Sequence, residues 1–169
     1  MLGGEQEGNI FAGTQGMPAI FGFGEAAEEA KNITENGELV QALKNHLIEN
    51  IKDLKSVTIN SPVDACPYIL NLSISGLPSQ PIVNFMSERN IQISAGSACK
   101  MGHRSPVLTA MGLDSKIIDS AVRISFSRYN TKEETELLIE AIKEIDQELI
   151  RVEKVLKDAI KAYEEKFGK

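Results

Sequence analysis

The sequence predicts an α+β fold in which a sheet of few strands packs against long helices. Long stretches with helical periodicity stand near both ends of the chain, and four short strand candidates lie between them. A βαβ repeat with a phosphate-binding glycine loop is not found, which argues against a doubly wound parallel sheet. At 169 residues the chain is long enough for one domain with a real core, so we expect a two-layer arrangement.

The N-terminal part of the chain is expected to form a loop followed by a long connecting helix. Residues 1–17 are rich in glycine and lack hydrophobic periodicity, which is typical of a loop segment. Over 18–54 a leucine or isoleucine recurs every fourth residue from Leu39 onward, which predicts a helix. Glycines inside this stretch predict either a close packing contact or a kink: Gly22, Gly24 and Gly37.

The remaining residues, 55–169, are expected to form the small α+β domain itself. Short apolar or alternating runs bounded by turn residues predict four strands: 56–60, 68–74, 91–95 and 121–129. A short helix is expected from Pro81 to Asn90, and another directly after Pro106.

A capping box at Thr131–Glu134 predicts the start of the last helix, which should run to about Phe167. Apolar residues keep alternating spacings of four and three along this helix: Leu138, Ile142, Ile145, Leu149, Val152, Leu156, Ala159 and Tyr163. Two interpretations stay open. The helix lies along the sheet or against the first helix, or it associates with itself as a coiled coil.

The charge and composition exclude several classes of protein. The formal net charge of −6 argues against nucleic acid or an anionic membrane as the main partner. The apolar runs stay well below the roughly 20 residues of a membrane span. The first residues are rich in glycine and glutamate and do not resemble a signal peptide, so we expect a cytoplasmic protein.

The chain contains two cysteines and two histidines, none at the spacing of a zinc site, so we expect no metal centre: Cys66, Cys99, His46 and His103. In a reducing compartment both thiols are expected to stay free. We expect Cys66 to be structural, and His46 to be a surface or packing residue on the first long helix.

The stretch ISAGSACKMGHRSP, residues 93–106, surrounds Cys99 with small residues and then with basic ones. Small neighbours leave a thiol accessible, and the basic side chains that follow favour its nucleophilic thiolate form: Lys100, His103 and Arg104. On these residues alone, an incidental loop cysteine is the alternative. A cysteine protease is disfavoured because no recognisable protease signature accompanies the thiol.

Two further residues are candidates for binding groups. Arg123 stands in the middle of an alternating strand with serines on the same face, and its planar guanidinium suits a two-pronged grip on a carboxylate. A surface ion pair is the alternative. Thr14 stands among glycines just ahead of a helix, where its hydroxyl and nearby N–H groups suit a phosphate. A helix-capping loop is the alternative there.

Taken together, four stretches resemble the C-terminal part of the cysteine desulfurases, which are pyridoxal-phosphate transferases of the aminotransferase class V type. They are GGEQEGNIFAGTQGMPAI, ILNLSI, IQISAGSACKMGHRSPVLTAMGL and VRISFSRYNTKEETELLIEAI. The resemblance covers nearly the whole chain to about residue 145. It implies the small C-terminal domain of a fold-type I pyridoxal-phosphate enzyme, with residues 1–17 facing the cofactor.

The resemblance also implies roles for the candidate residues. Cys99 would attack the sulfur of cofactor-bound L-cysteine, leaving L-alanine and a Cys99 persulfide. Arg123 would hold the substrate carboxylate, and Thr14 would reach the cofactor phosphate of the neighbouring subunit in a homodimer. The persulfide would pass to an iron–sulfur scaffold or another sulfur acceptor. Glycine beside the thiol suits a loop that swings between the two sites.

The chain departs from the family in ways that affect these expectations. The family's cofactor-binding lysine belongs to its large domain, and no matching histidine–lysine motif occurs here, so the chain alone should be inactive. Phe11 stands where the family usually has arginine, and the helix beyond residue 145 is longer than the family requires. We therefore expect a piece of a desulfurase. A stand-alone persulfide carrier or interaction module, and half of a split enzyme, are the alternatives.

Overall fold

The computed structural model describes residues 3–95 and 104–167, and the chain divides into two compact units at Asn36 and Gly37. The first unit contains a 3-10 turn, η1 (Gln6–Asn9), and helix α1 (Met17–Glu29), followed by a second turn, η2 (Ala30–Asn32). None of the α1 side chains is buried. Pro18 stands in the first turn of α1, where its missing N–H removes no helical hydrogen bond.

The stretch predicted as one connecting helix consists of two α-helices in the structure. Helix α1 ends at Glu29, η2 follows, and α2 covers Ile33–Ile51. The interruption lies at none of the three glycines. It lies at Ala30–Asn32, the 3-10 turn η2, whose side chains are all exposed, so no packing against the core holds this segment in the α-helical form. From Gly37 onward α2 belongs to the second unit, where its buried side chains join the core.

The second unit is built on a four-stranded antiparallel sheet in the order β1-β2-β4-β3. The strands are β1 (Val57–Ile59), β2 (Ile69–Ile74), β3 (Ser94–Ala95) and β4 (Ala121–Ser125). Each lies within one of the four predicted strand segments. Before β3 the chain leaves helix α3 (Ser79–Ser87) through a turn in which Asn90 is left-handed (φ 60°) and the Ile91 N–H donates to the Met86 carbonyl.

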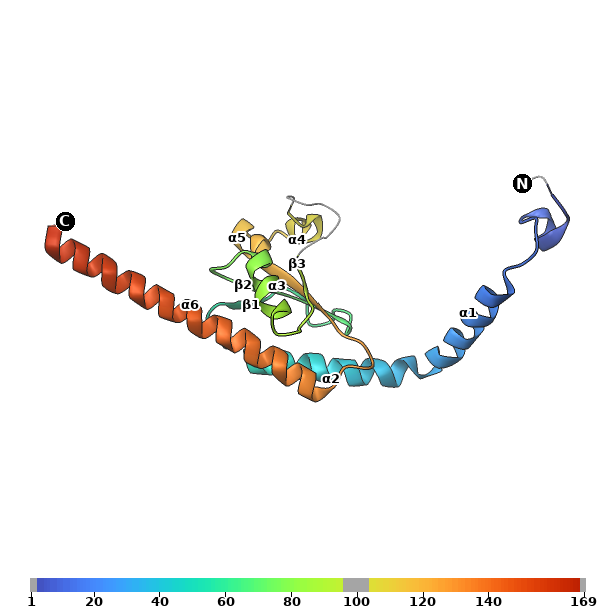
Figure 1. Cartoon of the computed structure of the whole chain (residues 1–169), viewed down its shortest axis with the longest axis horizontal. Coiled ribbons are helices and arrows are strands. Elements are labelled where there is room, and N and C mark those ends of the chain that lie inside the picture. The colour runs from blue at the N-terminus through green and yellow to red at the C-terminus, as the bar shows by residue number, and fades with distance from the viewer. Residues whose placement is uncertain (1–2, 96–103, 168–169) are drawn as a thin grey trace. The chain divides into compact units, whose positions relative to one another are not determined.

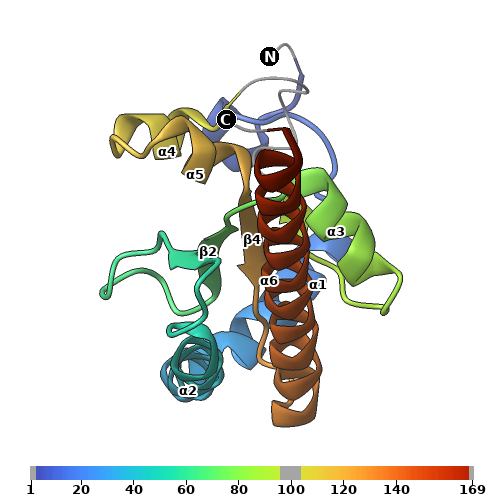
Figure 2. The ribbon, with the colours of Figure 1, turned by 90° about the vertical axis from the view of Figure 1, so that its left-hand side faces the viewer.

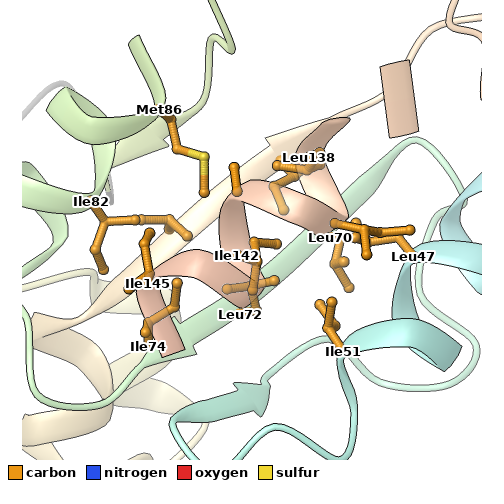
Figure 3. Close-up of a cluster of buried hydrophobic side chains, with 14 of the residues drawn as sticks. Leu47, Ile51, Leu70, Leu72, Ile74, Ile82, Met86, Leu138, Ile142 and Ile145 are labelled. Carbon is orange, nitrogen blue, oxygen red and sulfur yellow. The ribbon is translucent and has the colours of Figure 1, made fainter. Parts of the chain in front are cut away.

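One face of the sheet carries the hydrophobic core. Alternation along β2 and β4 points Leu70, Leu72, Ile74, Val122 and Ile124 to this face, where all are buried. Three helices cover it: α2, α3 (Ser79–Ser87) and the first half of α6 (Lys132–Phe167). Figure 3 shows side chains from these helices converging on those of the strands, and Figure 2 shows α6 between α2 and α3.

Helix α6 begins as the sequence predicts and packs along the sheet only in its first half. The capping box is confirmed: Glu134 N–H donates to Thr131 Oγ1 at 3.2 Å, and Thr131 N–H donates to Glu134 Oε2 at 3.1 Å. Leu138, Ile142 and Ile145 are buried in the core, so the helix lies along the sheet there. From Ile150 to Glu164 every side chain is exposed.

Two short helices cover one end of the opposite face: α4 (Pro106–Ala110), which the sequence predicts, and α5 (Ser115–Asp119), which it does not. Leu108, Ile118 and Ala121 form a small second cluster there, and Figure 1 shows α4 and α5 above the sheet. The signal for α5 was Asp114, whose side chain caps the helix by accepting from the Lys116 N–H. Among the described helices, none is both long enough and apolar enough to cross a membrane.

Candidate functional site

Arg123 lies in the middle of β4, on the sheet face opposite the main core. In the register of the sheet it is paired with Asn71 of β2 on one side and Ser94 of β3 on the other. Its side chain is exposed, and within the described part of the chain it has no ion pair or hydrogen bond. The alternative of a surface ion pair is therefore not what the structure shows, and the guanidinium is available to a ligand.

A network of polar groups on β2 and the residues after β1 borders Arg123. Asn60 Nδ2 donates to Asn71 Oδ1 and to Ser73 Oγ, both at 2.8 Å, and Ser61 Oγ accepts from the Asn71 N–H at 2.8 Å. Ser73 Oγ in turn donates to the Ile117 carbonyl at 2.7 Å. Buried Asn60 and Ser73 thus hold Asn71 in place beside Arg123. The alternating asparagine and serine in ILNLSI are the sequence signal for this network, which was not predicted.

Cys99 lies outside the described residues, as do Lys100 and His103, but both ends of its loop are placed. Ala95, the last residue of β3, pairs with Val122, the neighbour of Arg123 in β4. Cys99 follows Ala95 by four residues, so the chain can carry it at most about 14 Å from there. The fold therefore tethers the cysteine loop to the strand that borders Arg123.

Arg104 anchors the far end of the same loop. Its Nε and Nη2 atoms donate to the two carboxylate oxygens of Asp119 at 2.7 and 2.8 Å. This bidentate pair lowers the pKa of the Asp119 carboxyl and raises the pKa of Arg104. Arg104 was expected to favour a Cys99 thiolate, but its guanidinium is engaged by Asp119 at the C-terminal end of α5.

Thr14 belongs to the first unit and lies in the loop that precedes α1. The loop is closed by Gly13 N–H, which donates to Gln6 Oε1 at 3.2 Å, and by Gln15 Nε2, which donates to Glu7 Oε1 at 2.5 Å. Gly16 is the N-cap of α1, and no side chain caps the helix. The alternative of a helix-capping loop is therefore not supported, and the exposed threonine stands two residues from an uncapped helix N-terminus.

Cys66 and His46 are the other candidate side chains, and Cys66 does not pack in the core as a structural cysteine would. The Cys66 thiol is exposed instead of packed, and its backbone carbonyl accepts from Lys44 Nζ at 3.0 Å. Burial of Lys44 lowers the pKa of its ammonium group. His46 Nε2 lies 2.6 Å from Glu136 Oε1 and so links α2 to α6. Over residues 3–95 and 104–167, no three histidine, cysteine or carboxylate side chains converge as metal ligands.

A four-stranded small domain whose exposed arginine pairs with the strand that precedes the cysteine is an arrangement suited to binding a carboxylate. Residues 4–138 match the model of the aminotransferase class-V family, which is four fifths of the chain. The chain belongs to this family. The fold of its second unit is the small-domain α+β fold that the resemblance implied, with a four-stranded sheet packed against long helices.

The chain is similar to part of several known proteins. It is 35% identical over 147 residues to the cysteine desulfurase IscS of Vibrio vulnificus (strain YJ016), a match that covers 85% of this chain and 36% of the relative. The structure of a NifS-like protein from Rickettsia africae matches with 34% identity and a TM-score of 0.70, over 86% of this chain and 39% of that one. A second NifS-like structure has 31% identity and a TM-score of 0.72, over 85% and 37%. The chain thus spans little more than a third of the length of these relatives.

Proposed function

We propose that this chain is the C-terminal part of a cysteine desulfurase, a transferase that converts L-cysteine to L-alanine and leaves a persulfide on Cys99. The observation that carries the proposal is the available Arg123 guanidinium, paired across the sheet with the strand that leads into the cysteine loop. The similarity to a cysteine desulfurase of Vibrio vulnificus and to NifS-like structures supports it.

In this proposal Arg123 binds and orients the substrate. Its planar guanidinium donates two parallel hydrogen bonds to the carboxylate of L-cysteine, and the Asn60–Asn71–Ser73 network keeps the neighbouring strand rigid. Because Arg123 stands on a strand that is held rigidly, it keeps the substrate carboxylate in one place while the Cys99 thiol approaches. Arg123 therefore sets the position of the sulfur that Cys99 must reach.

Cys99 performs the sulfur transfer. Its thiolate attacks the substrate sulfur, so that a sulfur–sulfur bond forms while the carbon–sulfur bond breaks. The electron pair of the broken bond stays with the substrate side, where a proton is taken up and alanine results. The persulfide remains on Cys99 until its outer sulfur is passed to an acceptor, an iron–sulfur scaffold or another sulfur-accepting protein.

The residues of the first unit fit the phosphate of pyridoxal phosphate, the cofactor that supplies the electron sink for this reaction. Thr14 presents an exposed hydroxyl, and the uncapped N-terminus of α1 offers backbone N–H groups and a favourable dipole. The lysine that holds the cofactor in the family has no counterpart in this sequence. We therefore propose that the chain alone does not catalyse the desulfuration of L-cysteine.

The exposed apolar side chains of α1 agree with this proposal. Met17, Ile20, Phe21 and Phe23 are all exposed on one short helix, and a cluster of this kind marks a surface that meets further protein. We propose that it packs against the lysine-bearing domain. We further propose that the complete enzyme is a homodimer in the cytoplasm, where its thiols stay reduced.

The first experiment supplies the purified chain with pyridoxal phosphate and L-cysteine and measures alanine, sulfide and cofactor absorbance. No turnover and no bound-cofactor band are expected. Turnover that depends on Cys99 would mean that a lysine of this chain performs the cofactor chemistry. That result would contradict the proposal that the chain alone is inactive.

The second experiment joins this chain to the N-terminal part of the Vibrio vulnificus relative in place of the matching segment. Cys99→Ser should abolish both alanine release and the gain of one sulfur atom by the protein, while Cys66→Ser, an exposed-cysteine control, should leave them unchanged. Arg123→Ala should lower kcat/KM by about 100-fold, since charge-assisted bonds to a carboxylate are lost, and Arg151→Ala should not. Persulfide that follows Cys66 instead of Cys99 would refute the assignment.

A further inference from the structure

The second half of α6 carries an apolar stripe that the core does not use. Five of its side chains recur at helical spacing and each exposes more than half of its surface: Val152, Val155, Leu156, Ile160 and Tyr163. Ala159 lies among them on the same face. In Figure 1 this orange-to-red half of α6 runs past the end of the sheet. We call these six residues the α6 stripe.

The proposed desulfurase function does not account for the α6 stripe. The match to the aminotransferase class-V family ends at residue 138, and the stripe begins fourteen residues later. The side chains that do pack on the sheet end at Leu149, which is half-buried against the core. The helix therefore continues beyond both the family match and its own domain while keeping an apolar face, which helices facing water on all sides do not keep.

The charges beside the stripe are arranged in two opposite halves. Residues 151–157 contain three basic side chains and one acidic one, whereas residues 158–164 contain two acidic and one basic. Two copies aligned in parallel would place the two basic halves side by side, and likewise the two acidic halves. Two copies aligned antiparallel would place each positive half beside a negative half, which lowers their electrostatic free energy.

The sizes of the side chains favour the same orientation. In an antiparallel helix pair the two alternating core positions face each other, so Leu156 lies opposite Ala159 of the second copy and Val152 lies opposite Tyr163. Each layer then pairs a large side chain with a smaller one, as well-packed cores do. The charge distribution and the side-chain sizes therefore favour the same antiparallel alignment.

The area is sufficient for a specific pair. With the exposed fractions of its five side chains, the stripe leaves about 500 Å² of mainly apolar surface on each copy, or about 1,000 Å² for two when all of it is covered, which is the lower limit of specific interfaces. An interface of that size produces association that depends on concentration, and it does not require the catalytic dimer.

We propose that the α6 stripe is an antiparallel helix-pairing surface for a second copy of this chain. The proposal goes beyond the desulfurase function and does not rest on it, because it concerns only residues 151–164. It is tested on the chain itself by sedimentation equilibrium from about 1 to about 100 µM, a range that brackets micromolar association.

The wild-type chain should reach the mass of two copies at the upper concentration. Leu156→Glu with Ile160→Glu should weaken self-association by at least about 100-fold, as expected when charges enter an apolar interface. Both residues lie outside the core, so the circular dichroism of the variant should stay unchanged. Gln147→Glu, an exposed position on the opposite side of the helix, adds charge off the stripe and should keep the two-copy mass.

A second pair of variants tests the orientation. Arg151→Glu with Lys157→Glu makes both halves acidic and should weaken association. Adding Asp158→Lys and Glu164→Lys reverses the two halves and should restore it, because an antiparallel pair tolerates the exchange. Restoration is not expected of a parallel pair.

Three outcomes would overturn the proposal. The first is a one-copy mass for the wild-type chain over the whole range. The second is a two-copy mass that survives Leu156→Glu with Ile160→Glu. The third is a two-copy mass that is lost with Phe21→Glu and Phe23→Glu, the exposed apolar residues of α1, because association would then use α1 and not the α6 stripe.

Discussion

Asp146→Ala is the substitution whose effect on stability follows most directly from the structure. Asp146 is buried on α6, where it accepts hydrogen bonds from Ser56 N–H at 3.0 Å and from Ser56 Oγ at 2.6 Å. These bonds attach the residue before β1 to the long helix. Removing the carboxylate leaves a backbone N–H and a hydroxyl of Ser56 without this acceptor.

The magnitude follows from these two bonds. A hydrogen bond to a charged group contributes roughly 1.5–3 kcal/mol, so losing both costs about 3–6 kcal/mol. Alanine is a better helix former than aspartate by about 0.6 kcal/mol, which offsets a small part of the loss. We expect Asp146→Ala to lower the free energy of unfolding by about 3 kcal/mol. Ser56→Ala removes only the hydroxyl bond and should cost about 2 kcal/mol.

The assay is urea unfolding of the chain followed by circular dichroism at 222 nm. Asp158→Ala on the same helix is the control, because Asp158 is exposed and should change the stability by less than about 0.5 kcal/mol. After Asp146→Ala, adding Ser56→Ala should cost nearly nothing more, since the hydroxyl has lost its acceptor. A loss below about 1 kcal/mol for Asp146→Ala, or full additivity with Ser56→Ala, would refute this reasoning.

Two further predictions concern the core and the loop anchor. Leu72→Ala, at a fully buried position of the sheet, should cost about 3 kcal/mol in the same unfolding assay, whereas Val63→Ala at an exposed position should cost less than about 0.5 kcal/mol. Carbon-detected NMR should show the Asp119 carboxyl titrating below its usual pKa, and Arg104→Gln should return the pKa to that range. Because the folded pKa is depressed, the stabilisation by this pair is present above the unfolded pKa and lost as pH falls through the folded pKa. An unchanged Asp119 titration in the variant would contradict the pairing.

The strands were predictable where one face alternates. Val122, Ile124 and Phe126 repeat every second residue, and the structure buries all three. The capping box at Thr131 was equally clear because both of its hydrogen bonds are local. The interruption at Ala30–Asn32 and the helix α5 were not predicted. Both segments are short, and a short segment has too few residues for its own helix propensity to decide its conformation.

The candidate site was predictable as residue types but not as an arrangement. Arg123 was identified from its polar neighbours in the strand, yet only the register shows that Asn71 and Ser94 flank it. Asp119 was not identified, because its role depends on Arg104, fifteen residues away in sequence. Long-range pairs of this kind carry no periodic signal.

The sequence by itself determined the α+β class, the positions of the strands, the start of the last helix and the family, because local periodicity and ordered motifs carry that information. Only the tertiary structure decided which residues border Arg123, that Arg104 is engaged by Asp119, and that α6 divides into a buried and an exposed half. The heptad pattern of α6 is continuous through both halves. Whether an apolar residue is buried depends on what lies opposite it, and the sheet ends before the helix does.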